Sequence, residues 1–142
     1  MTSAQQGRRF SAITRTAAQT RVLDAALKLI SERGVGGTSL QMIADAMGVT
    51  KAAVYRQFKT KEEIVIAITE REMSKLEDAL EAAEAQGHPL RAREVLLDKM
   101  IEQAIDRRGA FSVPLFDPVI IRLQAAHEPF QRSVAPLDAA LL

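Results

Sequence analysis

Residues 38–61 read TSLQMIADAMGVTKAAVYRQFKTK, and this stretch decides the fold. Its apolar residues recur with the spacing of two short helices, which we expect at residues 40–47 and 51–58. Gly48 stands between them, where a left-handed backbone conformation costs little only for glycine. The small side chain of Ala44 suits a place where the two helices cross closely. The stretch therefore predicts two helices joined by a tight turn.

Hydroxyl residues stand at the start of each of these two helices. Thr38 or Ser39 is expected to cap the first, and Thr50 the second, by accepting hydrogen bonds from free N–H groups of the first turn. Val49 and Val54 are expected to fill the small core beneath the turn. This arrangement is typical of a helix-turn-helix, which sets its second helix into the major groove of DNA.

The pattern continues outward from this stretch on both sides. Helical periodicity predicts further helices at residues 17–33, 61–85, 90–108 and 118–126, a connector at 109–116, and the start of another helix after Pro129. The fold class is therefore all-α. The helix at 90–108 is expected to bury Leu97, Met100, Ile101, Ala104 and Ile105.

Composition agrees with a globular helical chain. Hydrophobic residues make up 47% of the 142 residues, charged residues 26% and aromatic residues only 4%. Residues 1–61 hold ten Lys and Arg against three Asp and Glu, a net charge of +7, whereas residues 62–142 hold nine against fifteen, a net charge of −6. A basic first half beside an acidic second half indicates that one end faces a polyanion; the alternative is that these charges only solvate the surface.

Several other classes of protein are not supported by the sequence. Without cysteine there is no disulfide or thiolate metal site, and a reducing cytoplasm is the expected setting. No apolar run is long enough to span a bilayer, and the N-terminus does not resemble a signal peptide. His88 and His127 are too far apart to predict a metal site, and neither a nucleophile–base set nor a phosphate-binding glycine loop is present. We expect no enzyme activity, cofactor or metal.

The run from Thr38 to Lys61, together with the helix before it, resembles the TetR family of bacterial repressors over roughly residues 20–68. The likeness is carried by Ile43-Ala44, Gly48-Val49, Val54-Tyr55, Phe58 and Lys61-Glu62. It implies a three-helix DNA-binding head followed by a helical domain for ligand binding and dimerisation. It also implies a homodimeric repressor that binds a palindromic duplex operator and is released from it by a small molecule.

The resemblance also assigns DNA-binding roles to individual residues. Thr38 and Ser39 match phosphate contacts, Gln41 a position that reaches a base edge, and Tyr55 a tyrosine that meets the DNA backbone. Lys61 matches a lysine that meets phosphate at the start of a helix. The leading turn of the second short helix matches the part that reads bases, so the full set is Thr38, Ser39, Gln41, Thr50, Lys51, Ala52, Ala53, Tyr55, Arg56 and Lys61.

Each role has a structural alternative. The hydroxyls of Thr38 and Ser39 can serve purely as caps, Gln41 can be solvated, and Tyr55 can be a core aromatic residue. Arg56 and Lys59 either face phosphate or are solvated. Gln57 stands where many family members carry histidine, which puts a contact from that position in doubt.

The second half of the chain matches the part of the family that senses ligand. We expect a tail at residues 1–16 that is either mobile or laid along DNA, the DNA-binding domain at 17–61 and a helical regulatory domain at 62–142. That last domain is expected to be incomplete, since family members are longer, so the chain is a truncated form or dimerises differently. An apolar effector is expected, with a pocket lined by Leu97, Met100, Ile101, Ile105, Phe111, Leu115, Phe116, Ile120, Leu123 and Phe130; ordinary helix packing is the alternative for each of them.

Two functions from different classes remain open at this point. The first is a sequence-specific DNA-binding regulator. The second is a helical protein-interaction module without sequence-specific DNA binding, because a fold alone does not settle function. The two differ in whether the chain binds duplex DNA with a steep dependence on salt.

Overall fold

All the secondary structure described in the computed structural model of the chain is helical. The structure describes Phe10, residues 13–106, residues 117–128 and Gln131. The expected all-α class is confirmed. The helices are α2 (Ala17–Arg33), α3 (Leu40–Met47), α4 (Lys51–Gln57), α5 (Lys61–Glu84), α6 (Pro89–Asp106) and α8 (Pro118–Ala126).

Local signals account for where these helices begin and end. The hydroxyls of Ser39 and Thr50 accept the backbone N–H of Met42 and Ala53, respectively, which confirms the expected caps of α3 and α4. Gly48 ends α3 in the left-handed region, with a φ of 67°. The expected connector at 109–116 and most of the chain after Pro129 lie outside the described residues.

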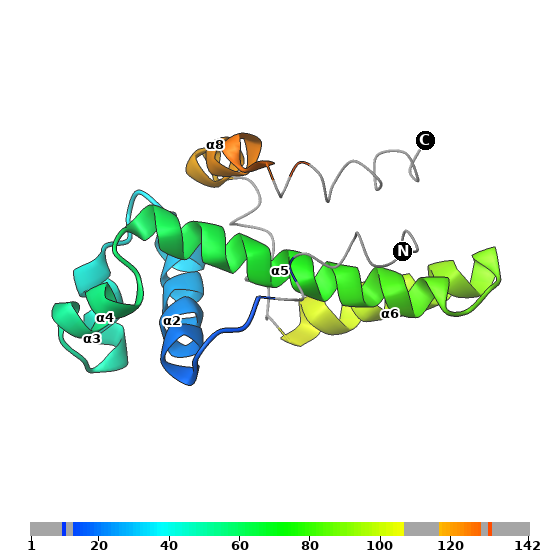
Figure 1. Ribbon diagram of the computed structural model, residues 1–142, viewed down its shortest axis with the longest axis horizontal. Helices are drawn as coiled ribbons and strands as arrows, with labels where there is room; N and C mark the ends of the chain where they lie inside the picture. Colours follow the sequence, from blue (N-terminus) through cyan, green and yellow to red (C-terminus); the bar gives the residue numbers. More distant parts are fainter. Residues whose placement is uncertain (1–9, 11–12, 107–116, 129–130, 132–142) are drawn as a thin grey trace.

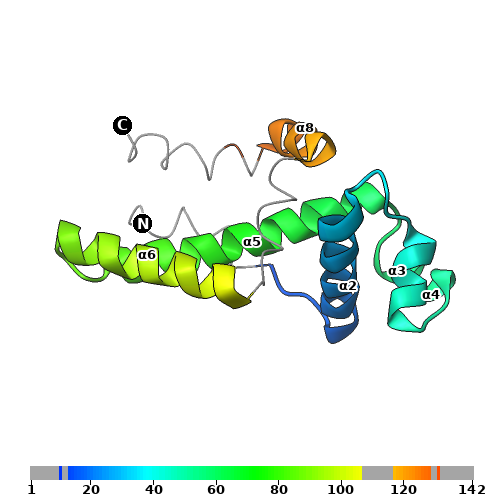
Figure 2. The ribbon, with the colours of Figure 1, turned by 180° about the vertical axis from the view of Figure 1, so that it is seen from behind.

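The long helix α5 organises the molecule. Figure 1 shows α2, α3 and α4 gathered at one end of α5, while α6 runs back along the other end. Figure 2 shows the same arrangement from behind. Helix α8 packs on α5 and lies close to the loop that leads from α2 into α3. Helices α2, α3 and α4 form a head, and α5 connects that head to α6.

The main core lies inside the head, where α2 to α5 and α8 meet. It consists of buried apolar side chains at helical spacing, as expected for one-sided helices packed together. Its members are Val22, Leu23, Ala26, Ile30, Val35, Ile43, Ala44, Val54, Phe58, Ile64, Val65, Ala67, Ile68 and Ile120. Ala44 is fully buried, which agrees with its predicted place between closely packed helices.

Two sequence predictions about burial are wrong. In α6, Leu97 and Ile105 are 59% and 69% exposed, and Met100 and Ile101 are exposed as well; the side chain of Ala104 is not described. The helix is rotated so that a different apolar stripe, Ala92, Val95 and Leu96, is half-buried. Helix α6 carries two apolar stripes, and periodicity does not say which one meets α5.

The second wrong prediction concerns Val49, which is 39% exposed instead of buried. Its backbone N–H donates to the Ala44 carbonyl at 3.0 Å, so the residue lies in the turn and outside both helices. Hydrophobicity alone suggested a core position, whereas the left-handed Gly48 before it directs the chain along the surface.

The segment before α2 makes contacts of its own. Phe10 is buried, and the Arg15 guanidinium lies 2.8 Å from the Glu70 carboxylate on α5. The division into a tail at 1–16, a head at 17–61 and a regulatory domain at 62–142 stays a prediction.

Candidate nucleic-acid interface

The first turn of α4 presents small and basic side chains to the surface. Lys51 and Ala52 are exposed and Ala53 is half-buried, while Val54 on the inner side of the same helix is fully buried. The Thr50 hydroxyl, at 3.2 Å, accepts the backbone N–H of Ala53 and fixes the start of the helix. Since Val54 anchors one side, the side with Lys51 and Ala52 is free to meet a ligand.

The turn between α3 and α4 brings these two helices together. Gly48 has a φ of 67° and a ψ of 32°, and its N–H donates to the Asp45 carbonyl at 3.1 Å. A side chain at this position would meet no atom within 4 Å, so the need for glycine comes from the backbone conformation. The turn is therefore the predicted one, and it places α4 beside α3 at the end of the molecule.

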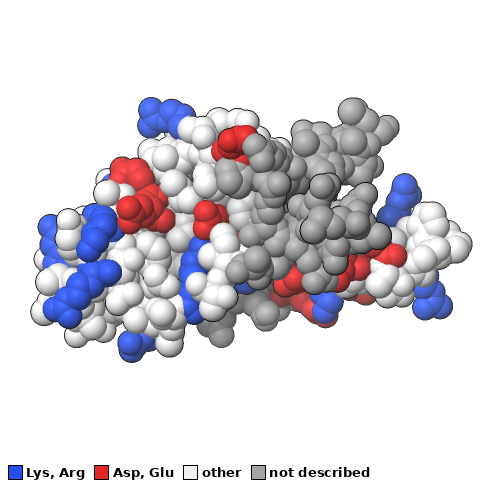
Figure 3. Space-filling model, in the orientation of Figure 1, with Lys and Arg blue, Asp and Glu red and all other residues white. Residues whose placement is uncertain are grey.

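Basic side chains gather at this end. Lys51, Arg56 and Lys59 are all exposed. Figure 3 shows Lys and Arg side chains over the end formed by α3 and α4, with acidic side chains nearer the middle of this face. Such a concentration of positive charge on one end favours a polyanionic partner.

Tyr55 lies at the surface of the head. Its side chain is 50% exposed, and the Lys59 ammonium lies 4.5 Å from the centre of its ring. This distance is within the range of a cation–π contact. Of the two possibilities raised by the sequence, the structure places Tyr55 outside the core.

The residues at the start of α3 are placed differently from one another. Thr38 is buried, and its hydroxyl donates to the Gly34 carbonyl at 2.9 Å. Ser39 is exposed, and its hydroxyl accepts the Met42 N–H at 3.1 Å. The structure thus brings Ser39, and not the Thr38 side chain, to the surface.

Gln41 is exposed on α3, on the same end of the molecule. Its Nε2 donates to the Asp45 carboxylate at 2.8 Å, one turn along the helix. The second N–H of Nε2 is left for a contact with a base edge while this bond is kept. The amide oxygen of Gln41 remains a second group through which it can bind.

Lys61 does not extend into solvent. Its Nζ donates to the Val35 carbonyl at 2.9 Å and to the Thr38 carbonyl at 3.1 Å, and the residue is half-buried. Sequence reasoning missed these bonds, because they join residues 26 and 23 positions apart and no local pattern signals them. The Lys61 ammonium is therefore bound to the loop between α2 and α3.

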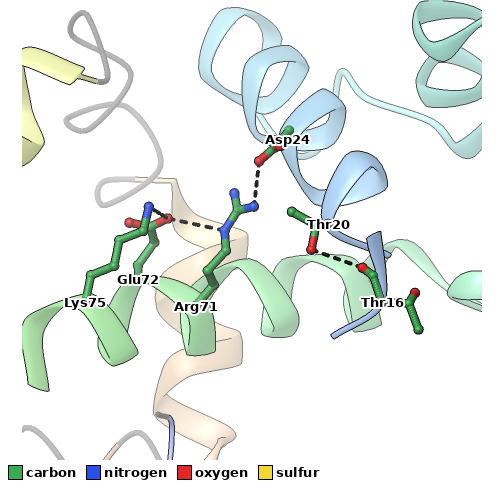
Figure 4. A network of polar contacts seen from close by, with 6 residues as sticks. All are labelled: Thr16, Thr20, Asp24, Arg71, Glu72 and Lys75. Atoms are coloured by element: carbon green, nitrogen blue, oxygen red, sulfur yellow. Dashed lines mark hydrogen bonds and ion pairs between the residues drawn. The ribbon is translucent and has the colours of Figure 1, made fainter. Parts of the chain in front are cut away.

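A network of charged side chains lies between α2 and α5 (Figure 4). The Arg71 guanidinium lies 2.6 Å from the Asp24 carboxylate and 3.7 Å from the Glu72 carboxylate. Lys75 lies 3.6 Å from the same Glu72 oxygen. Of these contacts, Arg71 with Asp24 joins α2 to α5, and the others lie within α5.

The residues predicted to line an effector pocket are not gathered together within the described ranges. Leu97, Met100, Ile101 and Ile105 are exposed on α6, whereas Ile120 is buried in the core of the head and Leu123 packs against it. Phe111, Leu115, Phe116 and Phe130 lie outside the described residues. The pocket stays a prediction.

The part of the chain that the structure describes shows neither a metal-binding cluster nor a membrane-spanning helix. No group of three or more His, Asp or Glu side chains there is placed to hold a metal ion. None of its helices has the length and apolar character needed to cross a membrane.

Comparison with known proteins gives a consistent result. Residues 22–68 match the family described as bacterial regulatory proteins, tetR family. The chain is 40% identical over 86 residues to the HTH-type transcriptional regulator AcrR of Shigella flexneri, which covers 59% of this chain and 40% of that protein. It is 38% identical over 64 residues to the HTH-type transcriptional repressor KstR2 of Rhodococcus jostii, covering 45% of this chain and 26% of that protein.

A third relative is the fatty acid metabolism regulator protein of Bacillus subtilis, which is 31% identical over 61 residues, or 43% of this chain and 31% of that protein. In each case the chain spans less than half the length of the curated relative it matches.

Proposed function

Because this chain belongs to the TetR family of bacterial regulatory proteins through residues 22–68, we propose that it is a sequence-specific DNA-binding transcriptional regulator, without enzyme activity. One observation carries the proposal. The first turn of α4 exposes Lys51 and Ala52 on the outer side of a helix whose inner side is anchored by the fully buried Val54. A rigid helix start with a basic, unobstructed surface is what insertion into a major groove requires.

The proposed interface is assigned by position on this surface. Lys51, Ala52 and Ala53 meet base edges, with Ala52 and Ala53 suited to thymine methyl groups and Lys51 to guanine. Gln41 is a further candidate for a base contact. Phosphate contacts come from Ser39, Thr50, Tyr55 and Arg56, whose side chains can position the head without reading sequence.

We further propose that the regulator acts as a homodimeric repressor, released from a palindromic operator by an apolar small molecule. One relative is named a transcriptional repressor, and this supports the sign of regulation. Release would follow from a higher affinity of the effector for the conformation that does not bind DNA. Two heads on a dimer would read half-sites separated by about one helical turn of DNA or a multiple of it.

The experiment that tests the main proposal is selection of random-sequence duplex DNA on the purified full chain, with the solution mass measured alongside. An enriched inverted repeat is the expected result. A matched control is the double variant Lys51→Glu and Arg56→Glu, which reverses two exposed charges and leaves the buried core intact. It should lose the enrichment and keep its helical circular dichroism spectrum.

The outcomes separate the two functions left open by the sequence. The exposed apolar side chains of α6, among them Leu97 and Ile105, are the observation that favours a protein-interaction module. A dimeric chain that enriches no duplex sequence would overturn the DNA-binding proposal in favour of that module. Enrichment by a chain of monomeric mass would keep DNA binding and contradict the homodimer.

A further inference from the structure

The backbone of Val35 is held at both its N–H and its carbonyl by charged side chains. Its N–H donates to Oδ2 of Asp117 at 2.8 Å, and its carbonyl accepts from Nζ of Lys61 at 2.9 Å. Lys61 is the first residue of α5, and Asp117 is the residue just before α8. Two residues that are distant in the sequence thus meet at one backbone unit of the head.

Asp117 uses its two carboxylate oxygens for two purposes. Oδ2 accepts the Val35 N–H, while Oδ1 accepts the Val119 N–H at 2.9 Å and caps α8. A carboxylate can serve both donors at once because each of its oxygens is an acceptor. Ile120, in the first turn of α8, is buried in the core of the head. The start of α8 is therefore attached to the α2–α3 loop by a polar contact and to the core of the head by an apolar side chain.

The loop is shaped for this approach. Gly34 has a φ of 74°, and a side chain there would lie 3.3 Å from the same Asp117 oxygen. The Val35 side chain is buried in the core, so the backbone of Val35 is also held in place by its own side chain. Asp117 can reach the Val35 N–H because Gly34 leaves the space beside it open.

This loop sets where α3 begins. The Thr38 N–H donates to the Val35 carbonyl at 3.2 Å, the Thr38 carbonyl accepts from Lys61 at 3.1 Å, and Ser39 follows directly as the cap of α3. A shift of the Val35 backbone would move Ser39 and the start of α3, and with them the turn that leads into α4. The position of the reading helix therefore depends on a loop that Lys61 and Asp117 hold.

We propose that Lys61 and Asp117 are positioning residues for DNA recognition, which fix the backbone of Val35 and thereby the start of α3. The inference rests on the proposed DNA-binding function. It differs from the role that the family resemblance implies for Lys61, because two of the three ammonium donors already bond to carbonyls of the loop. Lys61 then supports binding through geometry and not through a phosphate contact.

The salt dependence of binding separates these two roles. Each phosphate contact that is lost flattens the slope of log K against log salt by about 0.9 for duplex DNA. A positioning residue changes affinity by a similar factor at every salt concentration. The test uses the full chain and a labelled duplex carrying the selected sequence, or a mixed-sequence duplex of the same length if none is selected.

The variant Lys61→Met keeps the length and apolar stem of the side chain and removes its donors. We expect its dissociation constant to rise about tenfold at all salt concentrations, with the slope of the unmodified chain retained. Lys61→Arg, which keeps several N–H donors, should recover most of the affinity. The control is Arg56→Met, which removes an exposed charge of α4 that is assigned to a phosphate contact, and it should flatten the slope by about 0.9.

Asp117→Ser provides the second half of the test, because serine still caps α8 but cannot serve two donors from two carboxylate oxygens. We expect it to weaken DNA binding as well. The double variant should be weakened by less than the product of the two single effects, since both side chains act on the backbone of the same residue, Val35. Fully independent effects of the two substitutions would contradict a shared action on Val35.

Amide hydrogen exchange in the DNA-free protein gives a readout that does not depend on DNA binding. Lys61→Met and Asp117→Ser should each accelerate exchange of the Val35 and Thr38 amides, while the buried amides of α5 keep their protection. Unchanged exchange at both amides, or a flattened salt slope for Lys61→Met, would overturn the inference. An unmodified chain that binds no duplex would overturn the proposed function itself, and the exchange data would then report only on how the loop is held.

Discussion

The Lys59 ammonium lies 4.5 Å from the centre of the ring of Tyr55, four positions earlier in the chain. Both side chains are exposed, so the contact holds an aromatic residue at the surface and not in the core. An exposed cation–π contact contributes about 0.5–1 kcal/mol. The tyrosine is thus partly ordered before any partner binds.

This contact makes Tyr55→Phe an informative substitution, because it keeps the ring and removes only the hydroxyl. If that hydroxyl meets a phosphate, the dissociation constant for duplex DNA should rise about threefold to tenfold. The salt slope should not change, because the lost group is neutral. Titrations at four salt concentrations would show this, and an unchanged dissociation constant would remove Tyr55 from the interface.

Lys51 is predicted to read sequence, whereas Arg56 is predicted to contact phosphate. Repeating the duplex selection with Lys51→Ala should abolish one guanine preference, equivalent to about 1–3 kcal/mol of discrimination. Arg56→Ala should weaken binding to all sequences and leave the selected motif unchanged. The assignment of Lys51 is wrong if its variant selects the same motif as the unmodified chain.

The turn between α3 and α4 predicts a stability effect with a built-in control. Gly48 has a φ of 67° and open space around it, so Gly48→Ala should cost only the backbone strain of about 1–2 kcal/mol in the free energy of unfolding. Gly48→Asn should cost less, because asparagine tolerates the left-handed conformation better. Urea denaturation measures both, and equal stability of all three proteins would contradict the left-handed turn.

Adjacent residues of α8 test whether this helix is part of the core. Ile120 is buried among the residues of the head, whereas Ile121 is 49% exposed. Ile120→Ala should lower the free energy of unfolding by about 2–5 kcal/mol. Ile121→Ala should change it by about 0.5 kcal/mol or less. If the two variants are equally stable in denaturant titrations, α8 does not dock on the head as described.

The sequence allowed most helix boundaries to be predicted correctly, because their signals are local. The hydroxyls of Ser39 and Thr50 and the Asp117-Pro118 pair mark helix starts, and Gly34 and Gly48 follow helix ends. The helix-turn-helix was predictable for the same reason, since Ala44, Gly48 and Val54 lie within eleven consecutive positions.

The larger of the two errors concerned which side of a helix is buried. For α6, the periodicity of the sequence was correctly recognised as helical, but the side chosen as buried was wrong because Leu97 and Ile105 and their neighbours form the outer stripe. A single amphipathic pattern does not record which of two apolar stripes meets another helix.

By itself, therefore, the sequence determined the helices, their caps and the turn that joins α3 to α4, since each depends on residues a few positions apart. Only the tertiary structure decided what Lys61 and Asp117 do. Their shared partner, the backbone of Val35, lies 26 and 82 positions away, respectively. Hydrogen bonds of that range exist only after α5 and α8 have packed on the head, because only burial of residues such as Ile64 and Ile120 brings those two charged side chains to the loop.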